Sequence, residues 1–146
     1  MMVLVAAIGL LAMEGCDKEE DQTSAYPYQI IAEGNLYGNG QEGLSKQNLV
    51  IKTDSAWNSL KAQLNSANYT VDDVDFDFYS SMLIAVIDEV KENGGWTIDV
   101  TNIIETDNEI VVTVSNLQTG DDSAVITQPF QIVKLHISNK NVRFTN

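Results

Sequence analysis

Few residues of this 146-residue chain have side chains of the kinds that catalysis or metal binding usually needs. Cys16 is its one cysteine and His136 its one histidine. One cysteine excludes an intramolecular disulfide framework and a cysteine-rich zinc site, and one histidine excludes metal motifs that need a histidine pair. A Ser-His-acid triad needs a serine held beside the imidazole, and no serine lies in a Gly-x-Ser-x-Gly motif. We therefore expect His136 to lie on the solvent-facing side of a strand.

Acidic residues are the other candidates for chemistry, and Asp72, Asp73, Asp75 and Asp77 lie close together. Carboxylate oxygens bind hard cations such as Ca²⁺, but a helix–loop–helix calcium loop also needs a Gly and a Glu at fixed positions. Neither residue is in place, and the aspartates alternate with apolar residues, as on one solvated face of a strand. We therefore predict no bound metal, no cofactor and no enzymatic activity.

The overall charge restricts the partners. The chain has 8 Lys and Arg against 21 Asp and Glu, a formal net charge of −13. Binding to nucleic acid needs clustered basic residues that release counterions from the phosphates, so we exclude this class of partner. The length and a hydrophobic fraction of 44% predict one globular domain with its own core.

The N-terminal residues resemble an export signal. Met2 to Ala12 form an apolar run, shorter than the roughly 20 residues of a membrane-spanning helix and as long as the apolar part of a signal peptide. The run leads to Gly15 and Cys16, and a small residue before a cysteine resembles the end of a bacterial lipoprotein signal. We predict that residues 1–15 are this signal and that Cys16 becomes the acylated N-terminus. The alternative is an N-terminal core helix with a buried free cysteine.

A polar segment follows Cys16. Asp17 to Gln22 contains no apolar residue and buries no surface, so we interpret residues 16–25 as an acidic flexible tether. A cysteine followed by a lysine and two acidic residues is similar to the tethers of Gram-negative surface lipoproteins. This similarity implies a protein of the cell envelope that is lipid-anchored to the outer membrane, exposed at the cell surface, and attached to the membrane only through Cys16.

Apolar periodicity predicts one helix in the remainder, residues 26–146, which we expect to form a single domain. Trp57, Leu60 and Leu64 have the spacing of one face of a helix. Thr53 or Asp54 can cap its start by accepting a backbone N–H. We therefore place an amphipathic helix at about residues 54–65.

Most of the remaining chain has the patterns of strands. Alternating or continuous apolar residues, separated by turn residues, predict strands at 28–33, 48–52, 82–86, 97–104, 109–115, 131–138 and 142–144. Residues 74–78 also alternate with the period of a strand. We predict an α+β fold with a mostly antiparallel sheet of about six or seven strands, sandwich- or barrel-like, and one helix.

Aromatic and hydroxyl side chains raise two further hypotheses. Trp57 and Trp96 could stack on sugar rings or anchor a protein interface, but Trp57 lies on the apolar stripe of the helix, and we expect both in the core. Two Asp-Ser-Ala triplets, centred on Ser55 and Ser123, resemble an O-glycan acceptor pattern of some periplasmic and surface proteins. Ser123 is the better candidate because it lies in a predicted loop.

The order of several short segments is distinctive. The segments are Leu49–Lys52 before the helix, Val74–Phe76, Leu83–Ile87 followed by Asp88 and Glu89, Asn93–Ile98, and Gln128–Lys134. This arrangement resembles the C-terminal domain of the protease complex subunit PrcB family. The resemblance covers about residues 48–144, and it departs from the family at Trp96 and Phe130, where the family often has Tyr.

The resemblance implies architectural roles for several residues. Gly94 and Gly95 would supply a turn with positive φ. Pro129 would begin a strand, where no ladder donor is needed. The positions implied to be core are Phe76, Trp96 and Phe130.

The resemblance also implies a non-enzymatic, accessory function, because members of the family are associated with the stabilisation of a secreted or cell-surface protease. We predict that the protein binds and stabilises a protein partner, through an exposed sheet edge or through loops around 93–95 and 118–123. The residues expected at this contact are Asn93, Gly94, Gly95, Trp96, Gln128 and Pro129. The alternatives are a β-rich protease inhibitor that presents the same loops, and a cell-surface glycan-binding module that uses Trp96.

Overall fold

The computed structural model describes residues 22–37, 43–66, 69–71 and 76–146. The predicted signal at 1–15, Cys16 and most of the predicted tether lie outside the described residues. Asp72, Asp73 and Asp75 also lie outside them. No helix of the described part is long and apolar enough to cross a membrane.

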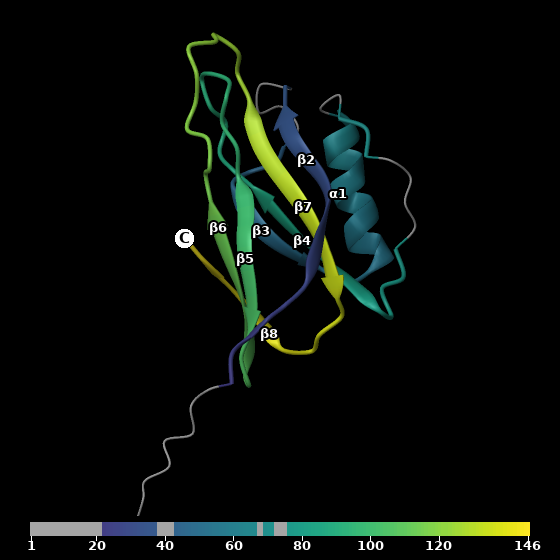
Figure 1. Ribbon diagram of the computed structural model, residues 1–146. Coiled ribbons are helices and arrows are strands. Elements are labelled where there is room, and N and C mark those ends of the chain that lie inside the picture. The colour runs from purple at the N-terminus through teal and green to yellow at the C-terminus, as the bar shows by residue number, and fades with distance from the viewer. Residues whose placement is uncertain (1–21, 38–42, 67–68, 72–75) are drawn as a thin grey trace, which may run out of the picture.

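Eight strands and one helix make up the regular structure of the described residues (Figure 1). The strands are β1 (Ser24–Ala25), β2 (Tyr28–Leu36), β3 (Gln47–Ile51), β4 (Ser81–Ile87), β5 (Asp99–Glu105), β6 (Glu109–Ser115), β7 (Gln128–His136) and β8 (Asn141–Thr145). The helix, α1 (Asp54–Ser66), lies between β3 and β4 in the sequence.

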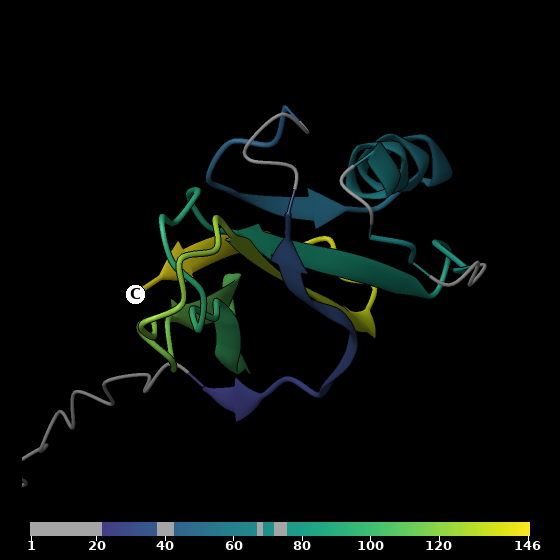
Figure 2. The same ribbon diagram turned by 90° about the horizontal axis from the view of Figure 1, so that it is seen from above.

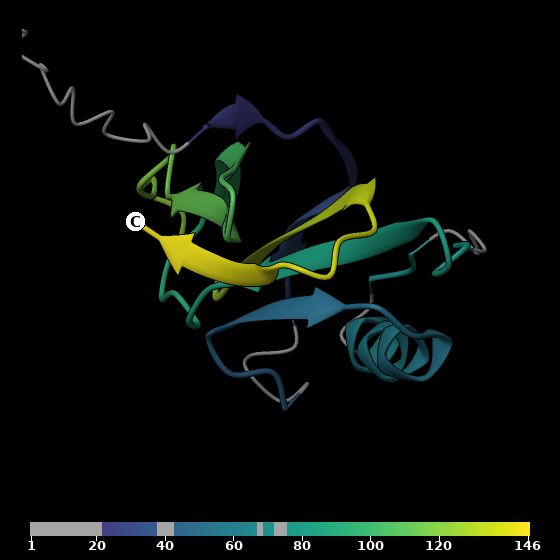
Figure 3. The ribbon, with the colours of Figure 1, turned by 90° about the horizontal axis from the view of Figure 1, so that it is seen from below.

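The strands form two four-stranded sheets, with the orders β1-β5-β6-β8 and β2-β7-β4-β3. Neighbouring strands are antiparallel except β6 and β8, which are parallel. The sheets are stacked without closing into a barrel, and α1 lies against the outer face of the β2-β7-β4-β3 sheet (Figures 2 and 3). The predicted α+β class is therefore confirmed, and of the two forms considered the sandwich is the one observed.

The helix forms where its apolar spacing predicts it. Trp57, Leu60 and Leu64 are its buried residues and contact the outer face of the sheet. The hydroxyl of Thr53 accepts a hydrogen bond from the N–H of Ala56 at 3.2 Å, which satisfies one of the orphan donors of the first turn. The predicted bounds, 54–65, differ from the observed ones by one residue.

Strand β4 has two hydrophobic cores, one on each side, which explains its unbroken apolar sequence. Leu83, Ala85 and Ile87 face the core beneath α1. The alternate residues Met82, Ile84 and Val86 face the core between the two sheets. All seven residues of the strand are buried.

Two local predictions differ from the structure. Ser24 and Ala25, at the end of the predicted tether, form β1 against β5, and a two-residue strand is too short to show any periodicity. The strand predicted at 74–78 is wrong at residues 76–78, the part that the structure describes, because a turn begins at Asp77, whose carbonyl accepts from the N–H groups of Ser80 and Ser81. The carboxylate of Asp77 accepts bonds from the N–H of Tyr79 and the hydroxyl of Ser80. Phe76 is buried, as predicted, with its ring 5.3 Å from that of Trp57.

Candidate functional site

Two long connections extend beyond the same end of the sheets (Figure 1). One joins β4 to β5 (residues 88–98), the other joins β6 to β7 (residues 116–127), and together we call them the paired loops. They contain both loops that the sequence suggested for a partner contact. The position of β4 brings them together, since β4 ends and β7 begins at this end of the molecule.

Backbone hydrogen bonds join the paired loops along most of their length. Lys91 and Thr127 exchange two N–H···O bonds, of 2.7 and 3.0 Å. Farther out, the N–H of Asp121 donates to the carbonyl of Gly94 at 2.9 Å, and the N–H of Gly120 donates to that of Gly95 at 3.1 Å. The loops therefore behave as an irregular extension of the sandwich and hold one defined shape.

Glycines permit this close approach. Gly95 has φ of 72° and Gly120 has φ of 93°, a region that L side chains rarely adopt. A Cβ on Gly120 would lie 2.7 Å from Nε1 of Trp96. The expected positive φ is thus confirmed for Gly95 and is wrong for Gly94. Gly94 is instead required by space, because it is buried and a Cβ there would meet the hydroxyl of Ser123.

Trp96 belongs to neither hydrophobic core, so the expectation of a core position is wrong for this residue. It is half-buried between the loops, and its indole N–H donates to the side-chain oxygen of Asn93 at 2.8 Å. The ammonium group of Lys91 lies 4.4 Å from the ring centroid. The hydrogen bonds between the loops fix this position, and no apolar pattern in the sequence encodes it.

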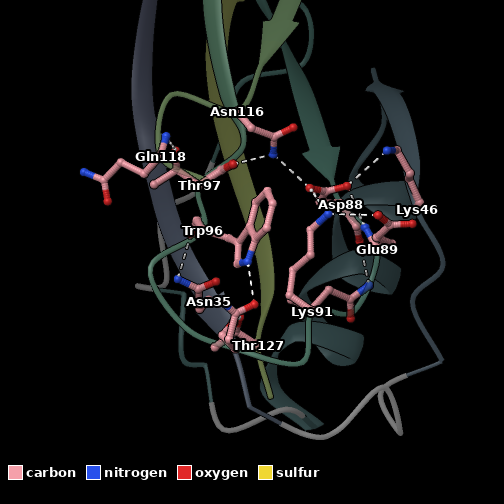
Figure 4. A network of polar contacts seen from close by, with 12 residues as sticks. Asn35, Lys46, Asp88, Glu89, Lys91, Trp96, Thr97, Asn116, Gln118 and Thr127 are labelled. Carbon is pink, nitrogen blue, oxygen red and sulfur yellow. Dashed lines mark hydrogen bonds and ion pairs between the residues drawn. The ribbon is translucent and has the colours of Figure 1, made fainter. Parts of the chain in front are cut away.

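The carboxylate of Asp88, 1% exposed, anchors the base of the paired loops (Figure 4). Oδ1 accepts from the N–H of Glu89 at 2.8 Å and lies 3.1 Å from the ammonium of Lys46. Oδ2 accepts from the amide of Asn116 at 2.9 Å and lies 3.2 Å from the ammonium of Lys91. One side chain thus connects the start of β3, the end of β4, and both loops.

These contacts keep Asp88 ionised. Burial is the largest single influence and opposes ionisation, but the combined donors outweigh it and lower the pKa of the carboxyl below its ordinary value. The pKa of Lys91 is raised, since its bonds to Glu89 and Asp88 outweigh its own burial. With four donors on its two oxygens, Asp88 positions the loops and has little capacity left for a ligand.

Gln128 and Pro129 lie at the base of the paired loops and are buried. The amide of Gln128 donates to the carbonyls of Leu44 at 2.9 Å and Asp88 at 3.0 Å. Pro129 lies near the start of β7, as expected, and its carbonyl accepts from the N–H of Asp88 at 2.9 Å. Both residues support the loops from the side of the sandwich, and because they are buried neither presents a surface to a partner.

Exposed apolar side chains concentrate on the paired loops. Leu117 is 68% exposed, and the loops carry three other large apolar residues that are more than a third exposed: Val90, Val125 and Ile126. No pattern in the sequence distinguishes these four residues, because scattered apolar residues in loops have no periodicity. Their exposure is visible only once the loops are seen to project from the sandwich.

The remaining candidates do not converge on a site. His136 is exposed, as expected, and is the register partner of Ser81 where β4 begins and β7 ends, on the two central strands of the sheet. Among the described residues no serine hydroxyl bonds to its ring, and the hydroxyl of Ser80 donates to Asp77 instead. Ser55 and Ser123 are both exposed, and the hydroxyl of Ser123 donates to the carboxylate of Asp121.

Comparison of the chain with protein-family models, with curated proteins and with solved structures finds no match.

Proposed function

We propose that this protein is a non-enzymatic, lipid-anchored protein of the cell envelope that binds and stabilises a protein partner through the paired loops. Acylation of Cys16 would hold it at the outer membrane with its folded domain facing outward from the cell. The resemblance to the PrcB family suggests that the partner is a secreted or cell-surface protease.

The position of the four exposed apolar residues carries this proposal. Single exposed apolar residues are common on proteins, but a group of them on one projecting unit is typical of a contact surface. Leu117 is the most exposed of the four. Removing such side chains from water on binding is the main source of favourable free energy in protein association.

The rigidity of the loops supports the same function. Binding costs free energy when loops and side chains must be ordered at the interface. The backbone pairing of the loops and the Asp88 contacts order them before any partner arrives. A partner bound in its folded state only would be stabilised by RT ln(1+[L]/Kd), which requires no chemistry from this protein.

A protease inhibitor is the second candidate, because a pre-organised loop that projects from a rigid β-sandwich is also the form in which inhibitors meet an active site. Sugar stacking on Trp96 is less well supported. The Lys91 ammonium and the backbone of Gly120 already lie against the indole, so less of the ring is open to a sugar.

Site-specific crosslinking in intact cells tests the contact surface. A photo-crosslinking amino acid in place of Leu117 is compared with the same amino acid in place of Tyr79, which is 97% exposed at the opposite end of β4. We expect one protein to be crosslinked repeatedly from position 117 and not from position 79. Equal crosslinking from both positions, or none from position 117, would contradict the proposed surface.

The purified crosslinked partner then distinguishes the two candidates. As a stabiliser, the protein raises the melting temperature of the partner and prolongs its activity; as an inhibitor, it abolishes the activity of a protease on titration. Leu117→Asp should weaken either effect at least about tenfold, as expected for a central apolar contact, whereas Tyr79→Asp should leave it unchanged.

A further inference from the structure

The outer edges formed by β5 with β1, by β2 and by β3 differ in how their backbone groups are satisfied. The outer edge of β5 is largely covered. The N–H of Val100 donates to the side chain of Gln131 at 2.7 Å, and its carbonyl accepts from the hydroxyl of Tyr28 at 3.0 Å. The carbonyl of Ile103 accepts from the N–H of Tyr26 at 2.9 Å, and β1 pairs with the end of the strand.

The edge strand β2 is also protected. Its register shifts between Ile30 and Ala32, and such a bulge disturbs the regular pairing that a further strand would need. The carbonyl of Glu33 accepts from the hydroxyl of Tyr69 at 3.2 Å. Gly34, with φ of 152°, lies in contact with the same tyrosine ring.

Strand β3 lacks these protections. It pairs with β4 over all five of its residues without a register shift, so its backbone is regular. Within the described ranges no backbone group or side chain pairs with its outer edge. A regular strand with an unpaired edge is a template for the addition of another strand.

The open edge of β3 borders a cleft that is lined by residues of β3 and β8. One hollow of this cleft, about 430 Å³, lies between Val50 and Lys52 on one side and Asn141 and Val142 on the other. A second hollow of about 420 Å³ is lined by Lys46 and Asn48 and, opposite them, by Asn146. Val50 is more than a third exposed, so the floor of the cleft presents an apolar side chain to solvent.

The ends of this edge carry positive charge. Lys46 and Lys52 immediately flank β3. Lys140 lies across the cleft, but its ammonium is 3.0 Å from the carboxylate of Glu105, so the positive charge at the edge comes from the two flanking lysines. Lys46 contacts Asp88, but its side chain is 63% exposed and keeps donors free for a ligand. Lys52 donates to the carbonyl of Ser138 at 2.7 Å, a bond to a neutral oxygen, and no carboxylate of the described residues forms an ion pair with it.

We propose that the outer edge of β3 binds an extended, acidic peptide segment of a protein partner by β-strand addition. The backbone of the segment would pair with residues 47–51. Apolar side chains on one face of the segment would cover Val50. Acidic side chains on the same face, two residues beyond the apolar ones at either end of the segment, would reach Lys46 and Lys52. This surface adjoins the base of the paired loops, since Asp88 and Asn116 also line the second hollow. Backbone pairing with residues 47–51 does not depend on the function proposed for the loops.

The same lysines could instead be protective, since charged residues beside an edge strand also discourage unwanted strand pairing. The two roles predict different responses to peptide charge. A binding site prefers an acidic peptide, whereas a protective pair of lysines rejects extended peptides of either charge.

Fluorescence anisotropy with labelled peptides tests the proposal on the purified protein. The probe is the peptide Glu-Thr-Val-Thr-Val-Thr-Glu, compared with Lys-Thr-Val-Thr-Val-Thr-Lys and with a version of the acidic peptide N-methylated at all five residues between its glutamates, so that donors toward either edge are lost. We expect saturable binding of the acidic peptide. We expect the N-methylated peptide to bind at least about tenfold more weakly, because it has lost backbone donors. We expect the basic peptide to bind at least about tenfold more weakly, because its charge does not complement the lysines.

Substitutions and hydrogen exchange locate the binding. Lys52→Glu should weaken binding of the acidic peptide at least about fivefold, whereas Lys134→Glu, the same charge change on β7 outside the cleft, should leave it within about twofold. The amides of residues 47–51 should gain protection from exchange when the peptide is added. Equal binding of the N-methylated peptide, or protection confined to the paired loops, would overturn the proposal, as would an absence of binding.

Discussion

The ammonium group of Lys91 lies 3.2 Å from the carboxylate of Asp88, at a point where both groups are withdrawn from water. The same ammonium lies 4.4 Å from the centre of the Trp96 ring. Lys91 therefore connects the buried carboxylate at the base of the paired loops with the indole packed between them. Because charge interactions strengthen as water is excluded, this arrangement stabilises the loops more than a surface ion pair would.

Replacement of Asp88 should destabilise the fold substantially. Asp88→Asn removes the charge that compensates Lys46 and Lys91, and breaking a buried pair by removing one partner costs about 3 kcal/mol or more. Urea denaturation of the variant measures this loss in the free energy of unfolding. Glu89→Gln is the matched control, since Glu89 is exposed and its removal should cost less than about 0.5 kcal/mol. Equal effects of the two substitutions would show that Asp88 does not anchor the loops.

The same carboxylate should make stability depend on acid. Its pKa is lowered in the folded protein, so the unfolded chain binds the proton more readily. The stabilisation is therefore complete above the unfolded pKa, about 4, and is lost as pH falls through the lower folded value. Melting temperatures of the wild type and Asp88→Asn should converge between neutral pH and pH of about 2.5. A constant difference across this range would contradict the assignment.

Gly120 should tolerate no side chain. Gly120→Ala places a Cβ against Nε1 of Trp96 and strains a residue with φ of 93°, which should cost about 3 kcal/mol. Gly43→Ala is the control, because Gly43 has a similar φ of 72° but a Cβ added there would meet nothing within 4 Å, and strain alone should cost about 1 kcal/mol. Near-UV circular dichroism should change for the first variant only, since only there must the tryptophan move.

The side chain of Gln131 should prove to hold the two sheets together through its hydrogen bonds. It is buried, accepts from the N–H of Val100 at 2.7 Å and donates to Glu33 at 2.9 Å. Gln131→Leu preserves much of its volume but leaves the Val100 N–H without its acceptor, which should cost about 1–3 kcal/mol. Hydrogen exchange should show faster exchange at Val100 in the variant than in the wild type. Unchanged exchange there would indicate that another group replaces the glutamine.

Much of the fold follows from patterns that are local in the sequence. The spacing of Trp57, Leu60 and Leu64 requires one apolar face at helical period, and these three are the buried residues of α1. The unbroken apolar run of β4 needs an apolar layer on both sides, and the structure provides two cores. Such patterns are informative because each element must bury its apolar face whatever the rest of the chain does.

The contacts of the candidate site depend instead on which distant segments meet. Three of the four donors to Asp88 come from Lys46, Lys91 and Asn116, and only the strand order places them around one carboxylate. The position of Trp96 between the loops also depends on which distant segments meet. Apolar periodicity thus determined the elements of this protein from sequence alone. Its buried charge, projecting loops and open β3 edge were decided by tertiary structure, because side-chain burial and backbone pairing between remote segments exist only once the sheets are assembled.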